Sequence, residues 1–450
     1  MKKIHDSRGN IVNVMPLKMQ RPRFTRTGKN MSRKRSFYIL VGVATAFIFF
    51  LALNQHYNNY FEHQLQPMIS DAELKLRHTK IHQSYTNYIK GAASDVTLYE
   101  IQKVINLQRK LIEKNMSGYR YLNGENEIDS SNLDNFVMER GGKPLRSIIL
   151  TSWRSGSTFL GEVINAHPAT YYHYEPLLDF GIIQIREEPF ADMALKNIES
   201  LLKCNYSNME HYLNFGKTHV WLFNHNAPLW EQCLMHKSIC WDPRFLSPFC
   251  QLFPFQSMKI VRLRLRLIEK ILAQDSLGAK VVFLVRDPRG SLQSRKHRDW
   301  CPGEPDCSDP SLLCSDLVSD FKAAVKFSKK YPRNFRVVRY EDLSVNPYEY
   351  VKDVYQFYGL DFHPNIIRYL DTHTKTDFGD MSSTFRNSKA APFHWRTDLT
   401  FFEVNEIQEA CKDAMQLWGY VRAENYTHQQ YFNPTINYSL EYPVGDFDIP

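Results

Sequence analysis

Apart from its first 36 residues, the chain has almost no net charge, and this near-neutrality argues against nucleic-acid binding. The formal net charge is +8 over 450 residues. Residues 1–36 carry eleven Lys or Arg against one acid, Asp6, which is +10, so residues 37–450 sum to +8 − 10 = −2. A nearly neutral folded part lacks the electrostatic attraction on which nucleic-acid binding depends. We therefore expect no nucleic-acid partner.

The sequence also lacks the patterns that hold a metal ion or build a repeat protein. Its eight cysteines have no zinc-knuckle spacing, no cluster of metal-ligating side chains is apparent, and no segment repeats. Their even number suits an oxidising compartment, in which they would form disulfides. Spacing does not give their pairing, although Cys301 and Cys307 bracket a turn-rich segment that a local bridge would fit. We expect activity without a metal.

Residues 37–53 form an uncharged apolar run of seventeen residues, at the short end of what spans a bilayer. A buried helix or a cleavable signal peptide would also be apolar, but a signal peptide has a short basic region, whereas 36 residues precede this run. The basic flank predicts a transmembrane signal anchor with the tail, residues 1–36, in the cytosol. Everything after Leu53 would then lie in the lumen, as in a single-pass type II membrane protein. The short span favours the thinner membranes of the early secretory pathway.

Acceptor triplets for N-glycosylation agree with a lumenal location for the remainder of the chain. They are at Asn115, Asn205, Asn425 and Asn437.

Residues 54–143 are polar and predict a lumenal stem that holds a catalytic domain away from the membrane. Within it, residues 95–116 place apolar side chains at helical spacings of three, four and seven, which predicts a helix. This stripe could form a homodimer contact or pack on the domain. We expect the catalytic domain over residues 144–422 and a C-terminal extension over 423–450.

Apolar strands alternate with helical stretches in the domain, which predicts an α/β fold. The expected strands are Ser147–Leu150, Lys280–Val285 and Phe335–Arg339. Near-continuous apolar runs joined through helices predict a central parallel sheet that binds ligands at the carboxyl ends of its strands. A further segment, Lys259–Leu267, alternates and would place three arginines on one face, either lining a cleft for acidic glycans or facing solvent. These are Arg262, Arg264 and Arg266.

A loop rich in hydroxyl groups, Thr151–Thr158, follows the first strand and opens a helix. Unpaired backbone amides, the helix dipole and Gly156 together suit a bound phosphate. The loop lacks the leading Gly and the Lys of a nucleoside-triphosphate loop. A capped helix without a ligand would explain the loop taken alone.

A second loop strengthens the phosphate interpretation. Arg286 follows the strand Lys280–Val285 directly, and Ser294 comes eight residues later. An arginine and a hydroxyl at a neighbouring strand end could hold a second phosphate. The alternative is a structural Arg–Asp pair at the start of the helix.

These motifs together resemble those of the Golgi carbohydrate sulfotransferases. Thr151–Leu160 with His173–Leu177 is similar to the family's 5′-phosphosulfate segment, and Val285–Arg295 to its 3′-phosphate segment. Val338–Leu343 and Trp395-Arg396 match the same family in order. The resemblance is closest to the branch that sulfates the 6-hydroxyl of galactose, N-acetylglucosamine or N-acetylgalactosamine. It implies the P-loop-like sulfotransferase fold, 3′-phosphoadenylyl sulfate (PAPS) as co-substrate, a glycan or proteoglycan acceptor and a Golgi location.

The resemblance also implies residue roles. Arg154 would neutralise charge on the leaving oxygen, and Glu175 would be the catalytic base if partial burial raises its pKa. A Glu175 paired with an arginine is the alternative, with His173 and His167 as further base candidates. Donor binding would fall to the residues of the two loops: Trp153, Arg154, Ser155, Gly156, Ser157, Thr158, Arg286 and Ser294.

Two other functions fit parts of the sequence. A lumenal nucleotide-dependent glycan kinase would use a similar loop, but the Lys and the magnesium carboxylates it needs are not evident in motif context. A non-catalytic type II lectin or receptor would explain the anchor and the cysteines but not two phosphate loops. Binding of adenosine 3′,5′-bisphosphate (PAP) distinguishes both from a sulfotransferase.

Overall fold

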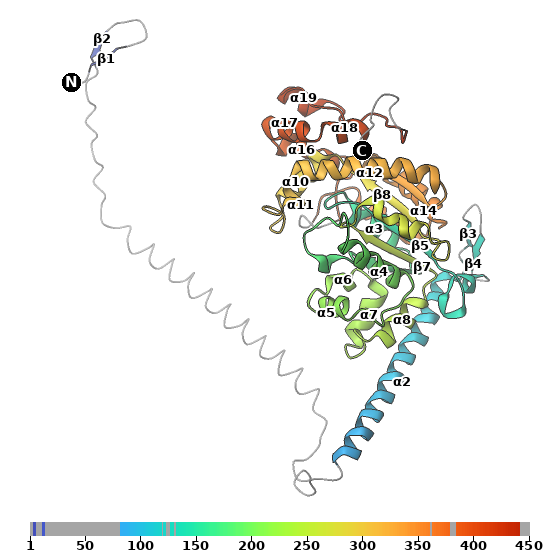
Figure 1. Cartoon of the computed structure of the whole chain (residues 1–450). Helices are drawn as coiled ribbons and strands as arrows, with labels where there is room; N and C mark the ends of the chain where they lie inside the picture. Colours follow the sequence, from blue (N-terminus) through green and yellow to red (C-terminus); the bar gives the residue numbers. More distant parts are fainter. Residues whose placement is uncertain are drawn as a thin grey trace, which may run out of the picture. The chain divides into compact units, whose positions relative to one another are not determined.

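The computed structural model of the chain describes residues 3–5, 11–13, 82–118, 120–122, 127–129, 132–360, 362–378 and 384–441 (Figure 1). The chain divides into two compact units, Met1–Thr86 and Asn87–Pro450. In the first, β1 (Lys3–His5) pairs antiparallel with β2 (Ile11–Asn13). The predicted anchor at 37–53 lies outside the described residues. Among the helices that are described, none is long and apolar enough to cross a membrane.

A five-stranded sheet with all its neighbours parallel forms the centre of the second unit, in the order β6-β7-β5-β8-β9. The prediction of a parallel sheet is therefore confirmed, as are its three strands, with β5 two residues longer than expected. Their bounds are β5 (Leu145–Leu150), β6 (Thr170–Tyr174), β7 (Phe255–Ile260), β8 (Lys280–Val285) and β9 (Phe335–Arg339).

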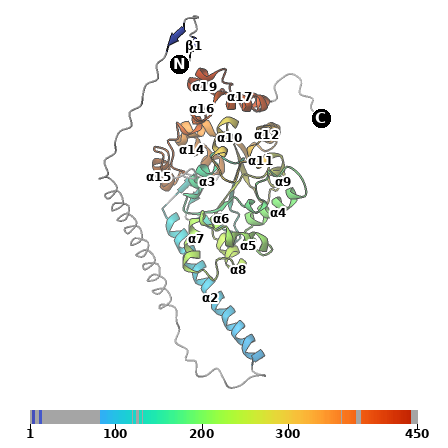
Figure 2. The same cartoon turned by 90° about the vertical axis from the view of Figure 1, so that its left-hand side faces the viewer.

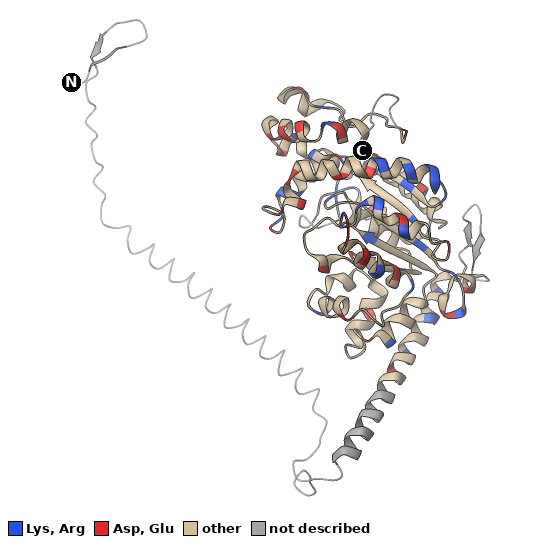
Figure 3. Cartoon of the chain, viewed as in Figure 1, with Lys and Arg blue, Asp and Glu red and all other residues tan. Residues whose placement is uncertain are grey.

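Helices surround this sheet in both views (Figures 1 and 2). The central strands β7, β5 and β8 are buried along nearly their whole length, so both of their faces are covered. The helices that cover these faces or join the strands include α3 (Ser157–Asn165), α10 (Pro288–Lys296), α12 (Pro310–Lys330) and α14 (Pro347–Tyr358). Along the ribbon of the unit, Lys and Arg positions are interspersed with Asp and Glu positions (Figure 3).

The helix α2 (His82–Met116) contains the predicted helix 95–116 and begins thirteen residues earlier. Five apolar side chains of its C-terminal half are buried in the main core: Ile101, Val104, Ile105, Ile112 and Met116. Polar contacts also hold the helix, because Glu100 pairs with His236 at 2.7 Å and Arg109 with Glu139 at 2.6 Å. This stripe therefore packs on the unit that contains the sheet. Leu98, Leu107 and Leu111 stay exposed.

All eight cysteines are paired, and the predicted local bridge Cys301–Cys307 is confirmed. The other three bridges are Cys204–Cys250, Cys233–Cys240 and Cys314–Cys411. Two of the four bridges lie in the long segment between β6 and β7, which folds into α4 (Phe190–Leu202), α5 (Glu210–Thr218), α6 (Trp221–Asn224), α7 (Ala227–Met235) and α8 (Pro243–Gln251).

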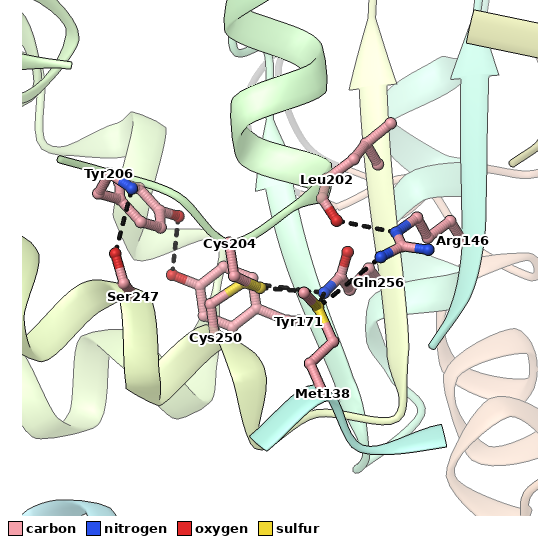
Figure 4. Close-up of a disulfide and its surroundings, with 9 residues drawn as sticks. All are labelled: Met138, Arg146, Tyr171, Leu202, Cys204, Tyr206, Ser247, Cys250 and Gln256. Atoms are coloured by element: carbon pink, nitrogen blue, oxygen red, sulfur yellow. Dashed lines mark hydrogen bonds between the residues drawn. A yellow bond between two sulfur atoms is a disulfide. The ribbon is translucent and has the colours of Figure 1, made fainter. Parts of the chain in front are cut away.

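Figure 4 shows one bridge within this helical segment and the hydrogen bonds that link its surroundings to the sheet. Cys204 follows α4 and bonds to Cys250 of α8. Gln256 of β7 donates to Cys204 Sγ at 3.0 Å, and Arg146 of β5 donates to the Leu202 carbonyl at 2.8 Å (Figure 4). The segment between β6 and β7 is thus cross-linked within itself by the disulfide and held by hydrogen bonds to β5 and β7, which bear the site described below.

The four predicted glycosylation sites lie at the surface of the second unit. Asn205, Asn425 and Asn437 are exposed, and Asn115 at the end of α2 is half-buried. Their modification stays a prediction.

Candidate active site

A cavity of about 1130 Å³ lies at the carboxyl ends of all five strands of the central sheet. Each strand contributes residues that follow it in sequence, which are Arg154 after β5, Glu175 after β6, Arg262 after β7, Arg286 after β8 and Tyr340 after β9. This is where parallel α/β sheets bind ligands, because the strand ends and the helix N-termini converge there.

The first predicted loop forms the floor of the cavity. Arg154 and Gly156 both have a left-handed backbone, with φ of +63° and +84°. A Cβ on Gly156 would lie 2.2 Å from the Tyr340 ring. This position therefore requires glycine for two reasons, its positive φ and the closeness of that ring. α3 begins at Ser157, and no described side chain caps its N-terminus. The alternative of a capped helix is therefore wrong, and the first amides of α3 are available to an anion.

The hydroxyl groups of the loop do not all face the cavity. Ser157 and Thr158 line it, together with Trp153 and Gly156. Ser155 is buried instead, and its Oγ donates to the Ser152 carbonyl at 3.0 Å. Ser155 would therefore contact a bound phosphate through its backbone amide and not through its hydroxyl.

The two predicted loops are joined directly. Arg286 Nη1 donates to the Arg154 carbonyl at 2.6 Å, and Arg154 Nε donates to Ser294 Oγ at 3.0 Å. Arg286 lies over the Tyr340 ring, with the guanidinium carbon 4.5 Å from the centroid. All these residues line the cavity. The sequence-predicted positions for two phosphates therefore lie side by side.

The second loop does contain a structural Arg–Asp pair, but Arg286 is not part of that pair. Asp287 pairs with Arg289 at 2.7 Å, and both side chains are almost fully buried. Arg289 also donates to the Val421 carbonyl at 2.8 Å, so its charge is satisfied in the core. Among the described residues, no carboxylate forms an ion pair with Arg286, and its buried Nε has no hydrogen-bond partner.

A cluster of positive charge results. The pKa of Arg154 is lowered to about 10, chiefly by burial. The positive charges of the nearby Arg298 and Arg286 also contribute to this lowering. Guanidinium groups that lie close together attract anions strongly, because each adds a positive charge and a fork of N–H donors. A buried donor such as Arg286 Nε calls for an acceptor. These features fit a ligand that carries phosphate groups.

Glu175 has the opposite pKa shift from the predicted one. Burial alone would raise its pKa, but Lys259 and Arg262, each 2.7 Å from a carboxylate oxygen, outweigh burial and lower it to about 2. The paired-carboxylate alternative is therefore the correct description of its surroundings. A carboxylate held by two cations is a weak proton acceptor. Its backbone is also left-handed, with φ of +42°.

The two histidine alternatives lie away from the cavity. His173 on β6 and His167 after α3 are buried, and burial lowers the pKa of each to about 3, with His363 adding to the effect on His167. Neither lines the cavity. Both are packed among core aromatic rings, His173 against Tyr171 and His167 against Phe255.

The three arginines of Lys259–Leu267 do not share one face. β7 ends at Ile260, so the alternation continues past the strand. Arg262 is buried and binds Glu175, while Arg264 is buried and pairs with Asp320 at 3.1 Å. Arg266 is exposed and donates to the Arg186 carbonyl. A solvated face is therefore wrong for two of them, and only Arg262 lines the cavity.

Several lining residues escaped the sequence analysis. Lys259 lies between Glu175 and Thr158, 3.4 Å from the Thr158 hydroxyl. Arg298 follows the second loop's helix. The segment between β6 and β7 adds a wall of rings, in which His219 stacks on Phe215 at 3.8 Å and lies edge-on to Trp221 at 4.9 Å. No sequence motif contains the ring residues of this segment, because only the folding of the segment between β6 and β7 brings them to the cavity.

Comparison with known proteins agrees with the site. Residues 144–419 match the model of the family described as "Sulfotransferase domain". Mouse (Mus musculus) carbohydrate sulfotransferase 5 is 26% identical over 321 residues, which is 62% of this chain and 81% of that protein. Human (Homo sapiens) carbohydrate sulfotransferase 6 is 26% identical over 315 residues, 61% of this chain and 80% of that protein.

A solved structure, the sulfotransferase domain from the Synechococcus PCC 7002 olefin synthase, is 20% identical and covers 60% of this chain and 95% of its own, with a TM-score of 0.36. The family match spans more than half of the chain and includes every strand of the central sheet and both phosphate loops. The chain belongs to the sulfotransferase family and is a sulfotransferase enzyme.

Proposed function

We propose that this enzyme transfers the sulfuryl group of PAPS to the 6-hydroxyl of galactose, N-acetylglucosamine or N-acetylgalactosamine in a glycan or glycosaminoglycan. One observation carries the choice of donor. Arg154, Arg286 and Arg298 gather beside an uncapped helix N-terminus in one cavity. PAPS carries a phosphosulfate and a separate 3′-phosphate, which suits two joined anion sites better than one.

The two loops divide the donor between them. The amides of Ser155–Thr158 and the hydroxyls of Ser157 and Thr158 would hold the 5′-phosphosulfate. Arg286 and Ser294 would hold the 3′-phosphate, with Trp153 lining the cavity. Arg154, which donates a hydrogen bond to Ser294 and belongs to the 5′ loop, would stabilise negative charge on the leaving phosphate oxygen.

The ring-lined end of the cavity supports a sugar acceptor. Sugars present apolar C–H faces that pack on aromatic rings, and Trp221 keeps 45% of its surface exposed beside His219. The relatives reported above are carbohydrate sulfotransferases by name. The family resemblance of the sequence motifs supports the 6-hydroxyl as the position.

The proposed location is the Golgi membrane, in single-pass type II orientation. It rests on the apolar run at 37–53, the basic flank at 1–36 and the glycosylation triplets. Four disulfides on the expected lumenal side agree with an oxidising compartment. A homodimer through the stem stays part of the proposal.

The experiment is transfer of radiolabelled sulfate from PAPS by the purified full-length protein onto a panel of glycans, followed by disaccharide analysis. We expect label on the 6-position of a hexose or hexosamine, and PAP binding in the absence of acceptor. Label on another position would overturn the choice of hydroxyl. Absence of both transfer and PAP binding would overturn the proposed donor.

A further inference from the structure

One histidine of the cavity is held by a carboxylate. His225, directly after α6, lines the cavity, and its Nδ1 lies 2.5 Å from Glu162 Oε1 on α3. Asn165 of the same helix donates to the His225 carbonyl at 2.6 Å, so α3 holds both the ring and the backbone. A carboxylate at Nδ1 keeps the ring proton there and leaves Nε2 as a proton acceptor. Among the described residues, His225 Nε2 has no hydrogen-bond partner.

A continuous set of contacts links this pair to the donor loop. Glu162 lies four residues after Thr158 on α3, so the two side chains share a face of the helix. The His225 ring stacks on Tyr174, with centroids 3.8 Å apart and planes at 12°. Lys259 Nζ lies 3.8 Å from the centroid of the Tyr174 ring and 3.4 Å from the Thr158 hydroxyl. His225 is therefore near the loop that would hold the 5′-phosphosulfate.

The same histidine borders the ring-lined end of the cavity. It follows α6, which begins at Trp221, and both residues line the same cavity as Phe215 and His219. A hydroxyl of a sugar packed on those rings would approach the donor past His225. The other acid–base candidates are in worse positions, since Glu175 is paired with two cations and His173 and His167 lie outside the cavity.

We infer that His225 is the general base of this sulfotransferase and that Glu162 is its positioning residue, an inference that rests on the proposed function. His225 Nε2 accepts the proton of the sugar hydroxyl as the hydroxyl oxygen bonds to sulfur. The bond from sulfur to the bridging phosphate oxygen breaks, and its electron pair leaves with PAP. Glu162 fixes the ring orientation and stabilises the imidazolium that forms.

Other titratable groups surround the pair. Tyr174 stacks on the ring and Lys259 lies over Tyr174. The charge of Glu162 also acts on three neighbouring groups, which are Tyr172, Tyr369 and His373.

The test compares His225→Asn, His225→Gln and Glu162→Gln in the full-length protein, with PAPS and the acceptor identified by the glycan panel. We expect both His225 variants to lose about 10²- to 10⁴-fold in kcat, the usual contribution of a general base, while the Kd for PAP changes less than twofold. The pH profile of kcat should differ between the wild type and the His225 variants. Glu162→Gln should lower kcat and change this profile while the Kd for PAP stays the same, because the ring loses its carboxylate partner.

The chain offers a matched control in a second His–Glu pair. His236 Nδ1 lies 2.7 Å from Glu100, and the exposure of this pair, 25% and 32%, resembles the 29% and 18% of His225 and Glu162. His236 does not line the cavity. His236→Asn should therefore keep the wild-type kcat and pH profile.

The outcomes separate this inference from the proposed function. Wild-type transfer together with His225 variants that bind PAP and keep kcat would overturn the base assignment alone. A variant that loses PAP binding would show that His225 supports the donor site instead. If the variants were too unstable to assay, added imidazole should restore activity to His225→Ala, and a failure to do so would count against the base. Lack of any wild-type transfer from PAPS would remove the proposed function and this inference with it.

Discussion

Arg286 and Arg289 lie three positions apart where β8 passes into α10, and both are buried, yet their charges have different partners. Arg289 is fully buried against Asp287, Gln408 and the Val421 carbonyl. Arg286, with 8% of its surface exposed, contacts the Arg154 carbonyl and the Tyr340 ring and has no carboxylate partner in the described part of the chain.

The difference separates a structural charge from a binding charge. A buried cation costs free energy unless an anion and hydrogen bonds compensate it. For Arg289 the fold supplies them. For Arg286, which has no carboxylate partner among the described residues, a ligand would supply the anion, so this side chain should affect binding more than folding. Four substitutions test this contrast.

Arg289→Met should have the largest effect, on stability. Asp287 would remain buried without its cation, and breaking such a pair typically costs about 3–5 kcal/mol of unfolding free energy. Denaturant unfolding of the full-length protein measures it. The control is Arg244→Met, since Asp242-Pro243-Arg244 repeats the local sequence Asp287-Pro288-Arg289 with an exposed ion pair. That variant should lose no more than about 1 kcal/mol. Equal losses in the two variants would refute the structural role of Arg289.

Glu175→Gln should flatten the dependence of stability on acid pH. The pKa of Glu175 is lowered in the folded state to about 2, so its contribution is present above the unfolded pKa of about 4.5 and is lost as pH falls from there toward 2. The wild type should lose on the order of 3 kcal/mol more than the variant over this range. Unfolding at a series of pH values measures the difference. Parallel pH curves for the two proteins would contradict the ion pairs with Lys259 and Arg262.

Arg286→Gln should weaken PAP binding with little loss of stability. Hydrogen bonds from a charged group contribute about 1.5–3 kcal/mol, which corresponds to a roughly 10- to 150-fold rise in Kd. The melting temperature should stay the same or rise, because the variant removes a cation from beside Arg154. Calorimetric titration with PAP measures binding, and Arg336→Gln on the exposed face of β9 is the control. Unfolding of the variant with unchanged binding would reverse the contrast.

Ser294→Ala should have the smallest effect. It removes the hydroxyl that accepts from Arg154 Nε at 3.0 Å and with it the link between the two loops. Because Arg154 keeps its other N–H donors, we expect a net loss of about 0.5–1.5 kcal/mol, so Kd for PAP should rise about two- to tenfold. The same titration measures it. A change as large as that of Arg286→Gln would contradict the smaller part in binding that we assign to Ser294.

Much of the sheet and of the two loops that line the cavity could be predicted from sequence, because each part is local. The apolar run Lys280–Val285 is a strand with the predicted bounds, and the turn at Gly156 needs a residue that tolerates positive φ. The acceptor side could not be predicted. Phe215, Trp221 and His225 come from the segment between β6 and β7, which has no motif and reaches the cavity only through helix packing and two disulfides.

The ion-pair partners of buried charged residues could not be predicted from the sequence either. Glu175 was expected to gain a raised pKa from burial, yet Lys259 and Arg262, more than eighty residues away, reverse the shift. Pairing across neighbouring parallel strands depends on sheet order, and the order β6-β7 is not a property of either strand alone.

The repeated tripeptide Asp-Pro-Arg separates the two levels most clearly. In both copies the Asp side chain caps a helix, accepting from the amide of the Arg that follows Pro, and pairs with that Arg at 2.7 Å. The sequence by itself determines this much, because the cap and the ion pair involve residues two positions apart. Tertiary packing decides that one pair is buried in the core and that the arginine of the other is exposed. Burial removes water from the charges, so the same local contact has a small effect at Arg244 and a large one at Arg289.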